Sequence, residues 1–358
     1  MAYTNIDDPS AYFQTALHSS ANAATITNDG NSDLQPDLIW SKARGAAHNH
    51  GLYDSTRGVT KLLSSNNASD EITASSGFDL TSFNTDGFST GNNQYNTICG
   101  GTTYVAWQWK ANGGTTSSNT DGDITSTVQV NQDAGFSIMT YTGTTGDVHT
   151  IGHGLGVTPQ VWIVKARGDG GDFDDWFFWH HQMAADNIVD NRMLFLNTNA
   201  AVATYTGINA VTSSTIRVKS STTAQNGVTY VAYAFAEKQG YSKFGSYIGN
   251  GTSGTDGTFV YTGFKPAFVM TKRASHADNW VVYDTKRDPH NEADHYLLPN
   301  SSDAEGSFAN WDFLSNGFKL RTGNSQGGIG ITFIYMAFAE NPFVTSGGAP
   351  ATAKALTG

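Results

Sequence analysis

The sequence has little cysteine and few cations, and both shortages restrict what the protein is. Among 358 residues the only cysteine is Cys99, so no internal disulfide framework exists and stability has to come from packing and subunit contacts. Lys and Arg number 20 against 31 Asp and Glu, which gives a net charge of -11. Nucleic-acid binding requires clustered cations that neutralise phosphates, so this charge argues against a nucleic-acid partner.

Long apolar runs and long helical patterns are also missing. No hydrophobic stretch approaches membrane-spanning length, so we expect no membrane insertion. The first eight residues lack a basic region followed by an apolar core, and we expect no secretory signal and synthesis in a cytoplasm. Gly, Thr, Ser and Asn are abundant instead, which is typical of an all-β protein with many turns.

Three segments share a period-2 pattern of large apolar residues that predicts a β-strand. They lie at residues 103–110, 229–237 and 332–340, and we call them the closing strands. The positions between the large residues are small or mildly apolar, so each strand is apolar on both faces. Such a strand is expected to be central in its sheet, with alanines that let another layer come close.

A second landmark precedes each closing strand. Pro36, Pro159 and Pro266 each begin an apolar stretch, as suits the first residue of a strand. They lie 68, 71 and 67 residues before Tyr104, Tyr230 and Phe333 of the closing strands. Basic residues follow each stretch, beginning with Lys42, Lys165 and Lys272, and we expect them to mark the exit to solvent.

The matching spacings predict three tandem repeats of about 100 residues, each a β-sandwich or jelly roll. The first repeat covers residues 10–112, the second 135–239 and the third 240–343. Residues 113–134 form a linker or arm, with an extra strand near residues 124–130. Residues 344–358 form a flexible C-terminal tail rich in Gly, Ala and Thr.

Candidate chemistry is sparse, and no catalytic residue or cofactor site is predicted. The first and third repeats share an Asp–Arg pattern, Asp54 with Arg57 and Asp284 with Arg287, which indicates local structural ion pairs. A Gly-rich loop carries four carboxylates that suit Ca²⁺, although their register differs from the helix-flanked calcium loop. The alternative is a solvated acidic loop. These carboxylates belong to Asp169, Asp172, Asp174 and Asp175.

Four consecutive aromatic residues form the candidate interaction surface. Alternate side chains of a strand face opposite ways, so one pair is expected in the core. The other pair either packs against another repeat or subunit, which we favour, or stacks on sugar rings. The four residues are Trp176, Phe177, Phe178 and Trp179.

Several motifs together resemble a family of repeat-containing structural proteins from tailed phages of marine bacteria. The resemblance covers essentially the whole chain. It includes the Pro-Asp-Leu-Ile-Trp-x-Lys-x-Arg pattern of residues 36–44 and the Phe-Asn-Thr-Asp-Gly-Phe-Ser pattern of residues 83–89. The remaining motifs are residues 54–58, 103–114, 152–156 and 339–343.

The resemblance implies a non-enzymatic virion protein, synthesised in the host bacterial cytoplasm and displayed on the particle. Capsid decoration, a head fibre and a tail fibre all fit this expectation. The expected partners are other capsid or tail proteins and further copies of the chain in a homo-oligomer, with a trimer favoured. The alternative is a tail adhesin that binds a host receptor or surface glycan.

Overall fold

The computed structural model describes residues 4–168, 174–183, 191–208, 210–323 and 325–342. These residues form an all-β fold of antiparallel sheets, and they contain no α-helix. Consistently, the described part of the chain has no helix long and apolar enough to cross a membrane. Its helical elements are three short 3₁₀ turns, η1 (Pro9–Ala11), η3 (Gly254–Asp256) and η4 (Ser325–Gly327).

Each closing strand lies between two partners in its sheet, as its two apolar faces predict. The first repeat has the strand order β1-β9-β3-β4, and the third has the equivalent order β20-β27-β22-β23. The second repeat has the same order, β12-β19-β14-β15, in the middle of an eight-stranded sheet. The bounds are β1 Phe13–His18, β3 Leu38–Ala43, β4 Gly51–Asp54, β9 Tyr104–Trp109, β12 Phe136–Thr142, β14 Val161–Ala166, β15 Phe177–His180, β19 Thr229–Phe235, β20 Ser242–Ile248, β22 Phe264–Arg273, β23 Val281–Asp284 and β27 Thr332–Pro342.

The register is also equivalent in the three sheets. The second residue after the landmark proline pairs with the closing-strand aromatic residue in every case. The pairs are Leu38 with Trp109, Val161 with Phe235, and Phe268 with Phe338. The sequence repeat therefore corresponds to a repeated strand order and a repeated register.

Smaller sheets accompany the central ones. Their orders are β2-β8-β7 in the first repeat, β13-β18 in the second and β21-β26-β25-β24 in the third, with β5-β6 as a separate pair. The eight-stranded sheet is completed by β10 and β11 at one end and by β16 and β17 at the other. The bounds are β2 Ala24–Ile26, β5 Lys61–Leu62, β6 Ile72–Thr73, β7 Leu80–Phe83, β8 Phe88–Thr90, β10 Ser117–Asn119, β11 Ser126–Asn131, β13 Val148–Gly152, β16 Arg192–Phe195, β17 Ala203–Thr204, β18 Thr215–Lys219, β21 Phe259–Tyr261, β24 Ala293–Tyr296, β25 Gly306–Leu314 and β26 Gly317–Leu320.

The arm expected at residues 113–134 forms β10 and β11, which extend the sheet of the second repeat. The extra strand predicted near residues 124–130 is present as β11, shifted toward the C-terminus. Gln129 on β11 donates hydrogen bonds to Ser55 at 2.9 Å and Thr56 at 2.8 Å in the first repeat. The arm therefore connects two repeats through side-chain contacts as well as through the chain.

In the first repeat, the two faces of the closing strand contribute to different cores. On β9, the side chains of Val105, Trp107 and Trp109 belong to a large buried cluster that draws residues from all three repeats. Ala106, on the opposite face, belongs to a separate cluster that also includes Phe88 of the smaller sheet. Small residues on this face allow the second sheet to approach, which explains the alternation of large and small side chains.

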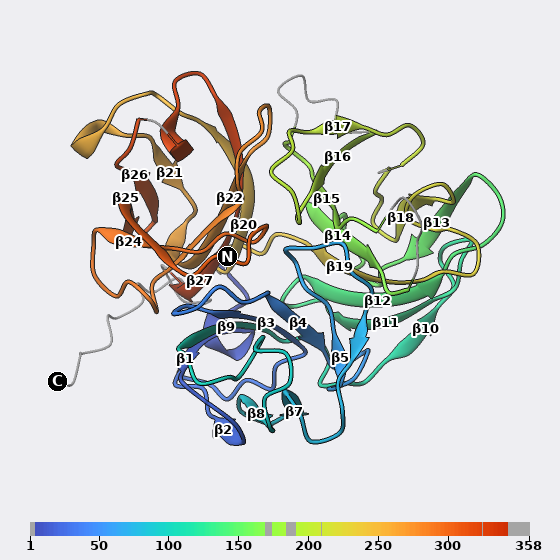
Figure 1. Ribbon diagram of the computed structural model, residues 1–358. Helices are drawn as coiled ribbons and strands as arrows, with labels where there is room; N and C mark the ends of the chain where they lie inside the picture. The colour runs from blue at the N-terminus through green and yellow to red at the C-terminus, as the bar shows by residue number, and fades with distance from the viewer. Residues whose placement is uncertain (1–3, 169–173, 184–190, 209, 324, 343–358) are drawn as a thin grey trace.

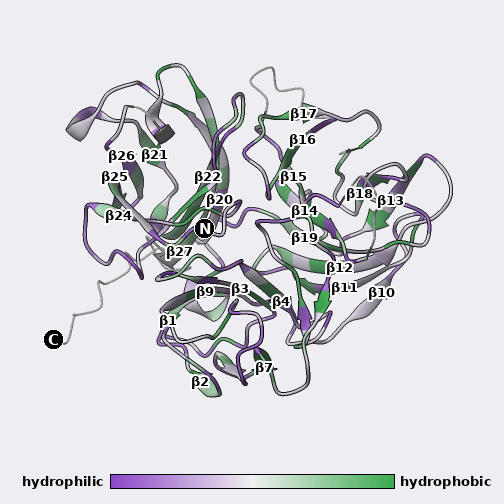
Figure 2. Ribbon diagram, in the orientation of Figure 1, coloured by the Kyte–Doolittle hydropathy of each residue, from purple (hydrophilic) through white to green (hydrophobic). Residues whose placement is uncertain are grey.

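The three repeats surround a common centre. Figure 1 shows them as three lobes, in blue, green and orange, and in Figure 2 hydrophobic residues lie on the strands while many connecting loops are hydrophilic. At the centre, the last aromatic residues of the closing strands meet edge to face. Their ring centroids are 6.4 Å apart for Trp109–Phe235, 5.6 Å for Trp109–Phe338 and 5.8 Å for Phe235–Phe338. Each ring thus contacts both others, and the arrangement closes.

Candidate functional site: the contacts between the repeats

At one equivalent position in each repeat, a ring N–H group donates to the backbone of a neighbouring repeat. The donors are His50, Trp176 and Trp280, which occupy equivalent positions because each immediately precedes the first residue of β4, β15 or β23. Because a carbonyl oxygen only accepts, Nε2 of His50 carries the proton, and its Nδ1 accepts from Trp40 at 2.9 Å. The contacts are His50 with the Leu298 carbonyl at 3.0 Å, Trp176 with the Ser64 carbonyl at 2.8 Å and Trp280 with the Phe195 carbonyl at 2.9 Å.

Three buried lysines also donate from each repeat to a neighbouring one, in the same direction as the ring N–H groups. Nζ of each lysine donates to the carbonyl of the next residue and to a carbonyl of the neighbouring repeat. The contacts between repeats are Lys42 with Ser302 at 3.3 Å, Lys165 with Ala68 at 3.1 Å and Lys272 with Asn199 at 3.5 Å. The first repeat thus donates to the third, the second to the first and the third to the second.

The expectation that these basic residues mark an exit to solvent is wrong for the lysines. Lys42, Lys165 and Lys272 are among the most buried residues of the described chain. Burial disfavours the charged ammonium and lowers the pKa of each lysine to about 8. Their long side chains reach carbonyls across the interface, and these acceptors belong to other repeats, so the local sequence gives no sign of them.

A backbone hydrogen bond links the same pairs of repeats with the donor and acceptor sides exchanged, and the residues that make it carry different side chains. The amides of Glu71, Glu305 and Val202 donate to the carbonyls of Arg167, Arg44 and Ala274 at 2.9, 2.8 and 2.8 Å. Two of these three positions therefore carry a carboxylate and an arginine, whereas the third carries valine and alanine.

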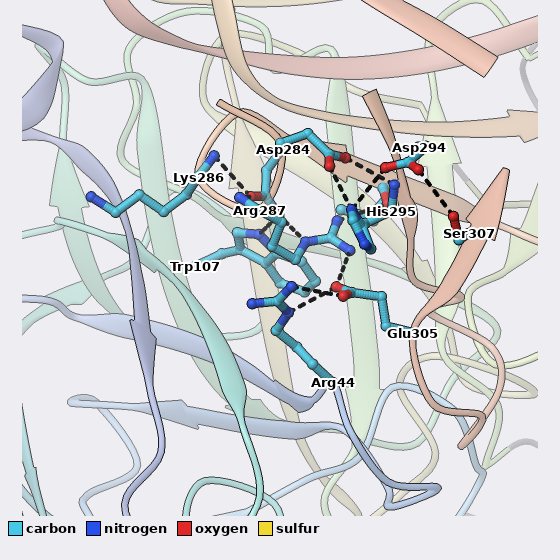
Figure 3. A network of polar contacts seen from close by, with 11 residues as sticks. Arg44, Trp107, Asp284, Lys286, Arg287, Asp294, His295, Glu305 and Ser307 are labelled. Carbon is cyan, nitrogen blue, oxygen red and sulfur yellow. Dashed lines mark hydrogen bonds and ion pairs between the residues drawn. The ribbon is translucent and has the colours of Figure 1, made fainter. Parts of the chain in front are cut away.

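Where the carboxylate is present, it bridges two arginines from different repeats. Glu305 contacts Arg44 of the first repeat at 2.7 Å and Arg287 of the third at 3.0 Å. Burial raises the pKa of Glu305, but the hydrogen bond from Arg44 and the charge of Arg287 outweigh it and hold the pKa below its usual value. Glu71 makes the equivalent bridge, and Figure 3 shows the Glu305 network.

The Asp–Arg pairs expected from the sequence form, and they are fully buried at the interfaces. The side chains of Asp284 and Arg287 are 2.6 Å apart, and Asp284 also accepts from Nε1 of Trp107 in the first repeat at 3.0 Å. The Arg287 guanidinium lies 5.8 Å from the centre of the Trp107 ring, a cation–π contact. The pairs are therefore part of the contacts between repeats and not local turn braces alone.

The pair in the first repeat meets the second repeat in the same way. Asp54 and Arg57 are 2.5 Å apart, and the phenol of Tyr233 donates to Asp54 at 2.7 Å. Trp107 and Tyr233 occupy equivalent positions on β9 and β19. The third closing strand has Met336 there, which offers no donor.

At the interface between the second and third repeats, the carboxylate equivalent to Asp54 and Asp284 is also replaced. His180 occupies the position of Asp54 and Asp284, because Val161 pairs with it as Leu38 and Phe268 pair with the aspartates. Its Nε2 contacts the backbone carbonyl of Tyr335 at 3.3 Å, and burial lowers its pKa to about 3. The imidazole is therefore neutral. It faces the third closing strand, where Met336 offers no side-chain donor.

The aromatic residues predicted to offer an interaction surface lie in the interior. Trp176, Phe177, Phe178 and Trp179 are all buried, because β15 is covered on both faces. Trp176 bonds to the first repeat, and Phe178 packs on Trp280 of the third repeat with ring centroids 4.6 Å apart. The structure places them in contacts between repeats, and no ring of this segment is exposed.

The acidic loop expected to suit Ca²⁺ is only partly described. Asp169 and Asp172 lie outside the described residues. Asp175 accepts a hydrogen bond from Asn197 at 2.6 Å, and Asp174 has an interaction partner. The described pair therefore makes contacts within the chain.

A different cluster of possible metal ligands is found in the third repeat. Within the described part of the chain, the ligand atoms of Asp288, Asp294 and His295 lie within 4.8 Å of one another. Nδ1 of His295 is 2.6 Å from Asp288 and 2.9 Å from Asp294, so the imidazole sits between two carboxylates. The hydrogen bond that the His295 imidazole donates to Asp288 raises the pKa of His295 and favours the charged imidazolium between the two carboxylates.

A shallow pocket lies between the first and third repeats. Its volume is about 170 Å³, and Gln14, Asn31 and Thr285 are among the residues that line it. Lys286 and Asp29, also in its lining, form an ion pair at 2.5 Å. Pockets for small molecules usually measure about 300–1,000 Å³, so this one is small for a ligand site.

Comparison with known proteins gives one match. A family model described as a domain of unknown function (DUF7483) matches residues 8–342. The chain belongs to this family. The match spans all three repeats and the arm. No curated protein and no solved structure matches the chain.

Proposed function

We propose that the protein is a non-enzymatic bacteriophage virion protein displayed on the particle surface. In this proposal its three repeats are related β-sandwich or jelly-roll-like units that together form one body with approximate threefold symmetry. The observation that carries it is the set of cyclic contacts between the repeats. Each type of contact occurs at equivalent residues and runs in one direction around the centre.

These contacts occupy the charged groups that an enzyme would place in a cleft. The buried lysines donate to backbone carbonyls, and the buried Asp–Arg pairs are satisfied by Trp107 and Tyr233. Titratable groups held in this way contribute rigidity and have no free coordination for a substrate. A rigid, acidic body of this kind fits a structural role, and the sequence motifs that resemble phage virion proteins support the setting.

The threefold arrangement within one chain bears on the expected partners. A homotrimer would normally bring three identical sandwiches around an axis, and here one chain does so with three different ones. We therefore propose capsid or tail proteins as the principal partners, in capsid decoration, a head fibre or a tail fibre. The alternative function is a glycan-binding adhesin. Its glycan would have to bind elsewhere than residues 176–179, because their aromatic side chains are buried.

Labelling of intact particles tests the proposal. Antibodies raised against the folded chain are expected to decorate assembled phage particles in negative-stain electron microscopy. Label on the head supports decoration or a head fibre, and label on the tail supports a tail fibre or an adhesin. Particles that contain no chain by mass spectrometry and bind no antibody would contradict the virion assignment.

A further inference from the structure

The third repeat differs from the other two in its exposed surface. Among the described residues, the strongly exposed large hydrophobic side chains are concentrated in this repeat, with five of eight there. Two of the five, Phe259 and Tyr261, lie on β21, where they are 45% and 58% exposed. Both point to the same face because alternate residues of a strand share a face.

The equivalent positions in the first repeat are polar. Val260 of β21 pairs with Phe318, as Ile26 of β2 pairs with Phe88, and both Val260 and Ile26 are buried. Their neighbours are therefore equivalent, and the first repeat has Thr25 and Thr27 where the third has Phe259 and Tyr261. Polar residues on an edge strand discourage pairing with other chains, whereas the third repeat has two aromatic residues there.

The backbone of β21 is open on one side. Among the described strands it is terminal in its sheet, with β26 as its one neighbour. The carbonyl of Thr258 accepts from Leu320 of β26, and the amide of Thr262 donates to Asn316 directly before β26, so residues at even positions face β26. The backbone groups of Phe259 and Tyr261 then point to the open edge, because these directions alternate along an antiparallel strand.

The second repeat shows that this edge can bind an extended segment. Ile151 of β13 pairs with Ile216 and is equivalent to Val260, so Thr150 is equivalent to Phe259. The carbonyl of Thr150 accepts a hydrogen bond from the amide of Ile124 in the arm at 3.0 Å. The buried side chain of Ile124 lies beside Ile151 in a parallel bridge. One repeat thus has a covered edge, one has a polar edge and one has an exposed aromatic edge.

We propose that β21 is a dimerisation strand that pairs antiparallel with β21 of a second copy of the chain. A twofold axis beside Val260 places Phe259 of one copy opposite Tyr261 of the other, in two identical aromatic pairs. These are the residues whose N–H and C=O groups face outward, so each pair exchanges two backbone hydrogen bonds. The three side chains of β21 are uncharged, so the copies meet there without charge repulsion, and the isologous contact closes as a dimer.

Light scattering coupled to gel filtration tests the proposal on the full chain. The wild type is expected to shift from its monomer mass of 38.3 kDa toward twice that mass as concentration rises. The double variant Phe259→Thr, Tyr261→Thr has the residues that the first repeat carries at these positions. It is expected to weaken dimerisation more than about tenfold, because both cross-strand aromatic pairs are lost.

The control is Phe308→Thr, which removes an aromatic side chain of 58% exposure from β25 of the same sheet. This variant is expected to dimerise like the wild type, and circular dichroism should show that all three proteins are folded. Amide hydrogen exchange in residues 258–262 should also slow as concentration rises. A wild type that stays monomeric, or a dimer that both variants leave unchanged, overturns the proposal.

Discussion

The hydrogen bond between Tyr233 and Asp54 gives the sharpest test of how the repeats hold together. Tyr233→Phe removes the phenol oxygen and leaves the packing of the ring intact. Asp54 then loses a donor at 2.7 Å inside a fully buried site, while Arg57 remains paired with it. A hydrogen bond to a charged group contributes about 1.5–3 kcal/mol, so we expect a loss of about 2 kcal/mol in the free energy of unfolding.

Tyr230→Phe on the same strand is the matched control. The Tyr230 hydroxyl accepts from the Gln225 amide at 3.0 Å and donates to the Thr222 carbonyl at 3.4 Å. Both partners are neutral and belong to the same repeat. A neutral hydrogen bond contributes about 0.5–1.5 kcal/mol, and the 3.4 Å contact with Thr222 is long and adds little. Tyr233 has an equally long second contact, with Arg57 at 3.4 Å, so the Tyr230→Phe variant should lose about half as much as Tyr233→Phe.

Urea unfolding followed by circular dichroism measures both losses, provided that the m-value is unchanged. With about 2.1 cal/mol/K of unfolding entropy per residue, the 358-residue chain should melt about 3 °C lower for Tyr233→Phe. A Tyr233→Phe protein as stable as the Tyr230→Phe protein would refute the reasoning. In that case the contact at Asp54 would add nothing beyond an ordinary hydrogen bond.

Three further substitutions test other contacts in the protein. Phe235→Ala should leave a cavity where the three closing strands meet and cost about 3–5 kcal/mol by calorimetry. The folded pKa of Lys42, about 8, lies below its unfolded value, so wild-type stability should rise between about pH 8 and 10, and less so in Lys42→Met. His295 has a raised folded pKa beside Asp288, so its stabilisation is present below its unfolded pKa of about 6.5 and lost as pH rises through the folded pKa. His295→Gln should therefore be less stable than wild type at about pH 5.5 in thermal melts, with a smaller difference at pH 8.

The repeat, the closing strands and the Asp–Arg pairs could be predicted from the sequence because each leaves a local signal. Period-2 alternation identifies a strand, and a second landmark at matching distances identifies its copies. Asp54 and Arg57 are only three residues apart, so their pairing is visible without a fold. Their burial is not, because Tyr233 comes from another repeat.

The lysines show why the rest could not be predicted. After four or five apolar residues, a basic residue usually marks the end of a buried strand, so the local sequence predicts an exposed Lys42. Its nearest acceptors include the Ser302 carbonyl, 260 positions along the chain. For the four aromatic residues at 176–179, alternation predicts one buried face, and packing against another repeat or subunit was the favoured interpretation of the other; the sequence does not show that Trp280 of the third repeat is the partner of Phe178.

The differences between the interfaces define how the three repeats fit together. Asp54 faces Tyr233 and Asp284 faces Trp107, so each buried carboxylate meets a closing strand that offers a donor. His180 faces the strand with Met336, where a carboxylate would be buried without a partner from that residue. Burying an unpaired charge costs far more than burying a neutral imidazole. If the three repeats were arranged in the opposite cyclic order, the carboxylate of Asp54 would face Met336. The presence of His180 and Met336 in place of a carboxylate and a donor therefore favours the observed cyclic order. This order gives the third repeat, which carries β21, a fixed place.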